Sequence, residues 1–341
     1  MGSKSSGFRT DEKIPKKISV GVCAYNEELN IGPLLESLSH QEFRRFEGLT
    51  EVLIVASGCR DHTEQIVREY SRRNPIVKLI SEPRRNGKAI AINRILSEFT
   101  GDLLVLIAAD VVPGSDSLEK LLCELMSDTR AGVVSGHPVP VNEEEGFIGY
   151  LVHLMWRLHH RTLKYLSELG LCTHATGELM ALKRNVVDRI PENVINDDAF
   201  ISVQAWKKGY AVRYCSQAIV FIQAPTNILD YFTQRRRVLY GHYMTKIVTG
   251  FHSRTLESML AYDPSTVFTI LGQELVERPK SLLSFPVSLL LEILAVFLAF
   301  SDIVLHNNRD RLLWGEVLST KSPASKIDMR VYGKHAPQTS L

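Results

Sequence analysis

The stretch Ile18-Ser-Val-Gly-Val-Cys-Ala24, followed directly by Tyr25-Asn-Glu-Glu28, sets the pattern for the first half of the chain. The first segment carries no charge, and a polar, turn-forming segment follows it. The same order recurs at residues 51–56, 77–80 and 103–109, each followed by a segment with helical spacing. Continuous apolar strands that alternate with helices are typical of a mostly parallel sheet covered by helices on both faces. The sequence therefore predicts an α/β fold.

Length and composition narrow the class of protein. The chain has 341 residues, of which 45% are hydrophobic, and a formal net charge of +2. A chain with this share of hydrophobic residues can bury a sizeable core, which excludes a disordered or collagen-like protein. The balanced charge argues against a dedicated nucleic-acid binder. The five cysteines form no C-x-x-C pair, so we expect reduced thiols rather than a disulfide scaffold or a zinc site. We expect residues 1–17 to form a flexible polar tail.

Polar side chains follow the predicted strands at the points where the strands end. They lie at residues 25–27, 57–61 and 84–88 and at Asp110. Because open α/β sheets bind their ligands at the carboxyl ends of the strands, we expect these segments to share one site. Asp110 ends an apolar strand, and its carboxylate suits Mg²⁺ or Mn²⁺. Lys88 follows Gly87, which lets a backbone approach a phosphate closely.

The ordered segments resemble the motifs of family 2 glycosyltransferases, which have the GT-A fold. Six landmarks carry the resemblance: Val22-Cys-Ala-Tyr-Asn-Glu-Glu28, Val55–Thr63, Gly87-Lys88 with Ala91 and Asn93, Asp110-Val-Val-Pro113, Asp197-Asp198, and Gln234-x-x-Arg237. Together they span residues 18–238. The resemblance implies a GT-A, Rossmann-like sheet and an enzyme that moves a sugar from a UDP- or GDP-linked donor.

The resemblance also assigns roles to individual residues. It implies a Mn²⁺ or Mg²⁺ ion on Asp110, a general base at Asp198 supported by Asp197, and an inverting reaction. Gln234 and Arg237, which share a helix face at i, i+3, are expected at the diphosphate and the acceptor. The donor nucleotide is expected to contact Ala24, Tyr25, Glu27, Ser57, Lys88, Ala109 and Asp110.

The chain departs from the family pattern at three positions. Ala108 stands where a further aspartate is expected, Ala56 replaces an acid that helps to recognise the nucleoside, and Val238 replaces a tryptophan. Two alternatives therefore stay open: a catalytically impaired relative that acts as a nucleotide-binding or membrane scaffold, and a nucleotidyltransferase that makes nucleotide sugars. Asp197 and Asp198 also suit a plain helix-capping role.

Histidines 153, 159, 160, 174 and 242 form no H-x-x-x-H pattern, and we expect most of them to be structural. Gly177-Glu178 resembles a segment on the acceptor side of the family's site.

Residues 282–300 form the most apolar stretch of the chain. Thirteen of these 19 residues are Leu, Ile, Val or Phe, and Glu292 is the single charge. That composition favours a membrane-spanning or membrane-embedded helix over 281–305, with a buried bundle helix as the alternative. The expected organisation is a GT-A domain over 18–250, a linker or amphipathic region over 251–280, and a polar tail over 306–341. We expect a membrane-associated enzyme with its catalytic domain in the cytoplasm, a glycan or lipid-linked acceptor, and no nucleic-acid partner.

Overall fold

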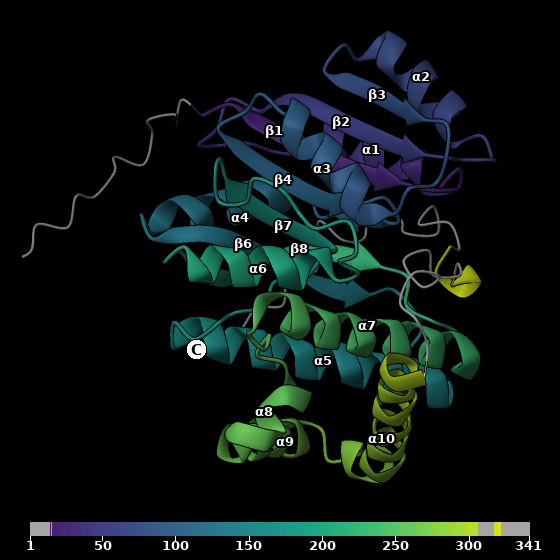
Figure 1. The fold of residues 1–341 in the computed structure, drawn as a ribbon, viewed down its shortest axis with the longest axis vertical. Helices are drawn as coiled ribbons and strands as arrows, with labels where there is room; N and C mark the ends of the chain where they lie inside the picture. Colours follow the sequence, from purple (N-terminus) through teal and green to yellow (C-terminus); the bar gives the residue numbers. More distant parts are fainter. Residues whose placement is uncertain (1–13, 15, 306–316, 322–341) are drawn as a thin grey trace, which may run out of the picture.

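The computed structural model describes residues 14, 16–305 and 317–321 (Figure 1). Most of the tail expected over 1–17, and most of the one expected over 306–341, lies outside these residues. Two described parts of them nonetheless contact the body of the protein. Ile14 forms an isolated parallel bridge with Phe46, and residues 317–321 include a short 3₁₀ helix, η2 (Leu318–Lys321).

The centre of the molecule is one sheet in the order β3-β2-β1-β4-β7-β6-β8-β5. The first four strands in that order are parallel to one another, as the apolar repeats predicted. β7 then runs antiparallel to both of its neighbours, β6 and β8 are parallel, and β5 is antiparallel to β8. The strands are β1 (Ile18–Ala24), β2 (Leu49–Ser57), β3 (Val77–Glu82), β4 (Leu103–Ala108), β5 (Val111–Pro113), β6 (Ala131–Pro140), β7 (Leu179–Lys183) and β8 (Ala211–Ile222).

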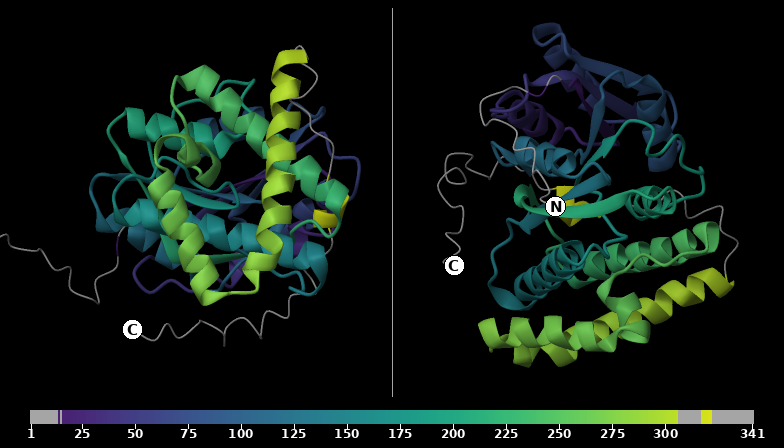
Figure 2. Two further views of the ribbon diagram at one scale, coloured as in Figure 1. Left: turned by 90° about the horizontal axis from the view of Figure 1, so that it is seen from below. Right: turned by 90° about the vertical axis from the view of Figure 1, so that its left-hand side faces the viewer.

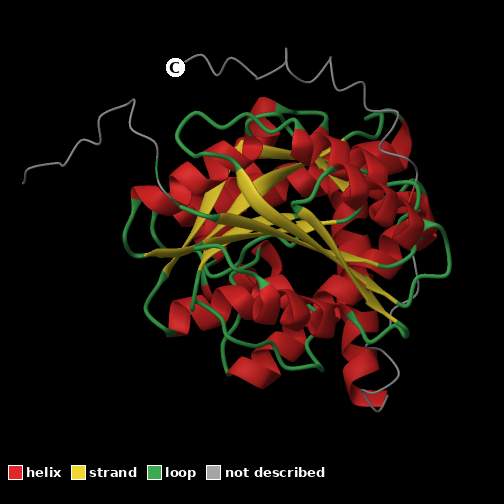
Figure 3. Ribbon diagram, turned by 90° about the horizontal axis from the view of Figure 1, so that it is seen from above, coloured by secondary structure: helices red, strands yellow, loops and turns green. Residues whose placement is uncertain are grey.

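Helices cover both faces of the sheet, which confirms the predicted layers (Figure 3). Alternate residues of β1 and β4, such as Val20 and Val105, pack against helices α1, α2 and α4 on one face. Leu104 and Leu106, the neighbours of Val105, pack against α3, α5 and α6 on the other. The helices of these layers are α1 (Ile31–Ser39), α2 (Thr63–Arg73), α3 (Lys88–Glu98), α4 (Ser117–Ser127), α5 (Gly146–Glu168) and α6 (Asp197–Lys207).

The remaining helices lie at the end of the molecule farthest from α2 and β3 (Figure 1). They are α7 (Ile228–Thr249), α8 (Leu256–Tyr262), α9 (Pro264–Glu277) and α10 (Ser281–Leu305). Figure 2 shows α9 and α10 together as the outermost layer, below α5 and α7. Helix α10 packs on α7, where Ala295 and Ala299 are buried against Leu239, Tyr240 and Met244.

Ion pairs hold this outer layer to the helices above it. The Arg235 guanidinium on α7 donates to both carboxylate oxygens of Glu292 on α10, at 2.8 Å each. Arg236 pairs with Asp302 in the same way. On the other side, Arg157 and Arg161 of α5 both bind the fully buried carboxylate of Glu274 on α9. The single charge predicted inside the apolar stretch is therefore paired with a protein side chain.

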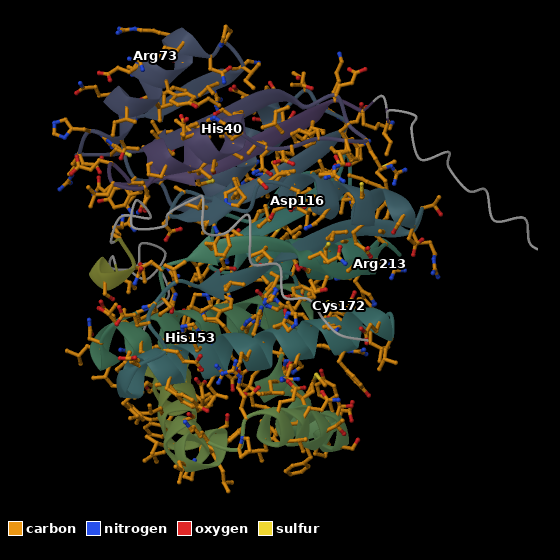
Figure 4. All side chains as sticks on the ribbon, turned by 180° about the vertical axis from the view of Figure 1, so that it is seen from behind. His40, Arg73, Asp116, His153, Cys172 and Arg213 are labelled. Carbon is orange, nitrogen blue, oxygen red and sulfur yellow. The ribbon has the colours of Figure 1, made fainter. Side chains whose placement is uncertain are left out.

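The outer face of α10 is apolar and exposed. Leu283, Leu290 and Phe297 are 83%, 63% and 67% exposed. Within the described residues, one helix is long and apolar enough to cross a membrane, over Phe285–Asp302 with a mean hydropathy of 1.9. The sticks on α8–α10 are predominantly carbon (Figure 4).

Some local features do not follow from the sequence pattern. The first helix begins at Ile31, and Asn26 before it has a positive φ of 53°, outside the α-helical range. Residues 211–222 form one long strand, β8. Strand β6 was not predicted: its sequence Ala-Gly-Val-Val-Ser-Gly-His-Pro-Val-Pro has two glycines and two prolines, which read as a loop.

Candidate functional site

The loop after β1 presents a carboxylate at the edge where the parallel strands end. Glu27 Oε2 accepts a hydrogen bond from Asn30 Nδ2 at 2.9 Å, and the Glu27 side chain is 11% exposed. Burial, together with the nearby charge of Asp110, raises the pKa of Glu27 to about 7. The loop is braced from α2, because the Glu27 backbone N–H donates to Thr63 Oγ1 at 2.7 Å. Glu27 and Asp110 therefore share this edge, as predicted.

A lysine from the far end of the chain reaches the same loop. Lys321 Nζ, on η2, donates to the carbonyl oxygens of Tyr25 at 2.9 Å and Asn26 at 2.7 Å, and to Glu27 Oε1 at 2.9 Å. Lys321 also lines a cavity of about 300 Å³, together with residues that include Asn26, Glu28, Arg60 and Asp61. Sequence reasoning placed Lys321 in a polar tail, and no local pattern around it indicates this contact.

The loops after β2 and β3 are tied to each other. Ser57 Oγ donates to Glu82 Oε2 at 2.6 Å, and the Asn86 backbone N–H donates to Ser57 Oγ at 3.2 Å. A Cβ atom on Gly58, where φ is +67°, would lie 2.3 Å from the Arg85 backbone nitrogen, so only glycine fits there. The Arg85 guanidinium in turn lies 4.0 Å from the centre of the Tyr25 ring. The Ser57 hydroxyl is thus hydrogen-bonded within this pair of loops. A direct contact between Ser57 and a nucleotide stays a prediction.

Asp110 lies half-buried between β4 and β5, and Ala109 before it is buried. Ala108, the position of the missing aspartate, lies opposite Glu178, because its backbone N–H donates to the Glu178 carbonyl oxygen at 3.1 Å at the end of the β4–β7 pair. Burial, with the charges of Asp198 and Asp110, raises the pKa of Glu178 to about 7. Glu178, the residue just before β7, thus lies beside the altered position, outside the motif.

Helix α6 begins with the two predicted acids. Asp197 Oδ1 lies 3.1 Å from Lys88 Nζ at the start of α3, so the expected phosphate-binding lysine is paired with the expected supporting acid. Burial alone would lower the pKa of Lys88, but Asp197 and Asp198 raise it above its usual range. A Cβ atom on Gly177 would lie 3.1 Å from Asp198 Oδ2, so Gly177 leaves room for that carboxylate.

Helix α7 carries the last predicted pair. Gln234 Oε1 is buried and has no hydrogen-bond partner among the described residues. Arg237, one turn further on, pairs with no carboxylate in the described part of the chain, unlike Arg235 and Arg236. Arg235 is buried against Glu257 and Glu292, and Arg236 pairs with Asp302.

The chain is similar to known glycosyltransferases. It is 23% identical over 246 residues to the probable glycosyltransferase YdaM of Bacillus subtilis (strain 168), a match that covers 69% of this chain and 57% of that protein. It is 29% identical over 137 residues to the dolichyl-phosphate beta-glucosyltransferase ALG5C of Trichomonas vaginalis (strain ATCC PRA-98 / G3), covering 39% and 38%. The chain thus spans about half the length of these relatives, or less.

The fold is similar to that of the mannosyltransferase PcManGT from Pyrobaculum calidifontis, solved in complex with GDP-Man and Mn²⁺. The TM-score is 0.61, the sequence identity 22%, and the match covers 86% of this chain and 88% of that one. The sequence model described as "Glycosyl transferase family 2" matches residues 19–190, which hold the strand-end loops, Lys88, Asp110 and Glu178. By that match the chain belongs to glycosyl transferase family 2.

Proposed function

We propose that the protein is a membrane-associated glycosyltransferase that moves a sugar from a UDP- or GDP-linked donor to an acceptor hydroxyl or lipid phosphate. The observation that carries the proposal is the convergence of the sequence motifs on one edge of the sheet. The charge of Asp110 acts on both Glu27 and Glu178 there, and the charge of Asp198 acts on both Glu178 and Lys88. Loops with this arrangement at strand ends are where α/β sheets bind nucleotides.

The donor would lie across the loops after β1, β2 and β4. The backbone at Ala24, Ala109 and Tyr25 would approach the nucleoside, and Glu27 would accept from its hydroxyl groups. Arg237, which pairs with no described carboxylate, would bind the diphosphate bidentately. Gln234 Oε1, buried and without a described partner, would receive a hydrogen bond from donor or acceptor.

A divalent cation fits the residues at Asp110. A carboxylate oxygen is the ligand that Mn²⁺ and Mg²⁺ prefer, and the like charges of Glu27 and Glu178 nearby make a cation favourable. Across the described ranges, no three His, Cys, Asp or Glu side chains are arranged to hold a metal by themselves. Asp110 would therefore hold the ion together with diphosphate oxygens, and the ion would offset the charge of the leaving group.

Asp198 would act as the general base. It would accept the proton of the acceptor hydroxyl while the oxygen attacks the anomeric carbon, and the nucleotide diphosphate would leave with the electrons of the broken bond. One base and no covalent intermediate give inversion. Asp197, fixed by Lys88 at 3.1 Å, would hold the start of α6 in place for Asp198. GDP-Man in the PcManGT complex supports the choice of a nucleotide-sugar donor, and the name of ALG5C supports a lipid phosphate as the other class of acceptor.

The outer helices would place the enzyme on a membrane, with the catalytic domain over 18–250 in the cytoplasm. Helix α10 lies along α7 and turns its paired acids inward, while leucine and phenylalanine side chains face outward. A helix held flat in this way would lie in the lipid interface with its apolar face buried there.

The experiment is nucleotide-diphosphate release by the full chain in detergent, with a panel of UDP- and GDP-sugars, a crude lipid extract, and Mn²⁺ present or absent. We expect one donor to be turned over only with metal. Asp198→Asn should lower the rate at least ~100-fold, in the range that a positioned base contributes. Asp110→Asn should abolish the metal dependence. Asp188→Asn, an exposed acid paired with Lys208, is the matched control and should change nothing.

Two results would contradict the proposal. Nucleotide binding without release from any donor would favour a scaffold. Release that survives Asp198→Asn would assign the base to another residue.

A further inference from the structure

Three histidines from three separate elements converge behind Asp198. His159 lies on α5, His174 in the loop before β7, and His242 on α7. The ring centres of His174 and His242 are 5.0 Å apart, and those of His159 and His174 are 5.7 Å apart, both edge to face. Cys172 lies two residues before His174, packed in the core cluster that includes Leu163 of α5 and Met180 of β7 (Figure 4). The three histidines therefore lie in the layer between the sheet and the outer helices.

Each of these rings has a buried nitrogen without a hydrogen-bond partner in the described part of the protein. The atoms are His159 Nε2, His174 Nδ1 and His242 Nδ1, and the His174 residue is only 5% exposed. Buried polar atoms are almost always paired, so three unpaired nitrogens on neighbouring rings point to a ligand's polar groups or ordered water as their partners.

Other histidines of the same layers are satisfied. His160 Nδ1, next to His159 on α5, lies 2.8 Å from the Tyr214 hydroxyl. His137 Nδ1 lies 3.2 Å from the Ser216 carbonyl oxygen, and His153 Nε2 lies 2.8 Å from that of Asn142. The unpaired nitrogens thus distinguish the cluster of His159, His174 and His242 from the histidines around it.

The cluster adjoins the proposed base. The charge of Asp198 acts on both His174 and His242. Gly177, three residues after His174, lies against the Asp198 carboxylate. On the other side, α6 and α7 touch closely: a Cβ atom on Gly241 would lie 2.0 Å from Asn196 Oδ1. His242 follows this contact and is thereby fixed relative to the start of α6.

The charges around the cluster are unfavourable for an anion. Burial lowers the pKa of all three histidines, that of His242 to about 4, so the rings are neutral near pH 7. The charged groups that act on them are Asp198, Glu257 and Arg235. Arg235 is already committed to Glu257 at 2.6 Å and to Glu292. A phosphate would meet the carboxylate of Asp198 and find no uncommitted guanidinium in Arg235, whereas a neutral hydroxyl both donates to and accepts from neutral imidazoles.

We propose that His174 and His242, with His159 behind them, form the acceptor subsite and hydrogen-bond a neutral, hydroxyl-bearing acceptor such as a sugar beside Asp198. This assignment rests on the proposed function and decides between its two acceptor classes in favour of a hydroxyl. The histidines orient the attacking hydroxyl and neither gain nor lose a proton in the reaction; its proton goes to Asp198. His174 and His242 are positioned to touch the acceptor, and His159 is a positioning residue.

The test is NMR of the full chain labelled with ¹⁵N in its histidine rings, in a detergent without a sugar head group. The signals are assigned with single substitutions to asparagine. Methyl glycosides of glucose, mannose and N-acetylglucosamine, and then inorganic phosphate, are added at equal concentrations. We expect at least one glycoside to shift the His174 and His242 signals saturably, and phosphate to shift neither. His160, paired with Tyr214, should not respond.

Substitution gives a second readout. His242→Asn should weaken the binding of that glycoside roughly tenfold, the effect of one or two lost hydrogen bonds. The same variant should keep the circular-dichroism spectrum and the cooperative thermal unfolding of the wild type, which shows that it folds. His160→Asn is the matched control and should bind the glycoside like the wild type.

Two results would overturn the inference: no shift with any glycoside, or a shift of His174 or His242 with phosphate. If nucleotide diphosphate is released but the glycosides shift nothing, the acceptor assignment fails and the glycosyltransferase proposal stands. If the glycosides shift the signals and no donor is turned over, the subsite stands and the proposed reaction fails.

Discussion

At the scale of single residues, the carboxylates of the site lower the stability of the folded protein. Glu27 and Glu178 are partly buried near other acids, and the pKa of each is raised to about 7. Ionised carboxylates crowded in this way destabilise the folded state unless a cation joins them. Such strain is commonly kept at functional sites because the binding partner relieves it.

Glu178→Gln tests this cost. Because the folded pKa of Glu178 is raised above the unfolded value near 4.5, its ionisation makes stability fall as pH rises from about 4.5 to about 7. Glutamine removes that penalty, so the variant should be more stable than the wild type at pH 8, by at most about 3 kcal/mol. At pH 4 the two should unfold alike. The measurement is thermal unfolding at both pH values; an equal Tm at pH 8 would show that Glu178 carries no such penalty.

The same variant should show whether a divalent cation binds close to Glu178. Mn²⁺ with UDP or GDP should raise the Tm of the wild type more than that of Glu178→Gln, since the ion offsets the charge that the variant lacks. Restoring an acid across the strand pair with Ala108→Asp in the Glu178→Gln background should return the full Mn²⁺ effect. An undiminished Mn²⁺ effect in Glu178→Gln would remove Glu178 from the cation's surroundings.

At the scale of elements, the 3₁₀ helix η2 ties distant parts of the chain together. The Ser319 backbone N–H donates to Asp230 Oδ2 at the start of α7, and Lys321 binds the loop after β1. This segment thus bridges the loop expected at the donor and the helix expected at the diphosphate. Its hydrogen bonds to two backbone carbonyl groups and a carboxylate are of the stronger, charge-assisted kind.

Lys321→Met should loosen that bridge. Methionine keeps most of the apolar stem but leaves the Glu27 carboxylate and two carbonyl oxygens without their donor. We expect a loss of stability of roughly 1–3 kcal/mol, the cost of unsatisfied buried groups. Hydrogen exchange of residues 25–30 should become faster, while that of α4, far from η2, should not change. Unchanged exchange at residues 25–30 would mean that the contact does not hold the loop. Lys280→Met, on an exposed lysine, is the control.

The elements also show what sequence can and cannot predict. The strands β1 to β4 and the apolar helix α10 follow from runs of mostly apolar residues, because such runs are recognisable without knowledge of distant residues. Glu178 and the histidine cluster could not be placed in this way. Glu178 acquires its position from the antiparallel pairing of β7 with β4, and the three histidines meet only through packing of α5 and α7. Lys321 lies 294 residues from Glu27, beyond any local pattern.

At the scale of the whole molecule, the predicted single apolar helix is half of a larger apolar surface. Phe268 and Val276 of α9 are 65% and 82% exposed, and Leu283, Leu290 and Phe297 of α10 lie in the same outer layer (Figure 2). Contiguous apolar surface of this kind marks contact with a membrane or another protein.

Charging this surface should detach the protein from lipid. The double variant Leu290→Glu with Phe297→Glu should sediment far less with vesicles of anionic phospholipid than the wild type does. Donor hydrolysis in detergent should be retained, since both side chains point away from α7. Lys164→Glu, on the exposed side of α5, is the matched control. Full vesicle binding by the double variant would exclude this surface as the membrane contact.

The pairing of Arg235 with Glu292 has a consequence for how the family diverges. Loss of Arg235 would leave the carboxylates of Glu292 and Glu257 without their guanidinium, at a cost of several kcal/mol. Loss of Glu292 would still leave Arg235 paired with Glu257. In an alignment of relatives, loss of the arginine that follows Gln234 should therefore coincide with loss of the acid 57 residues further on. The history of α7 is thus linked to that of α10.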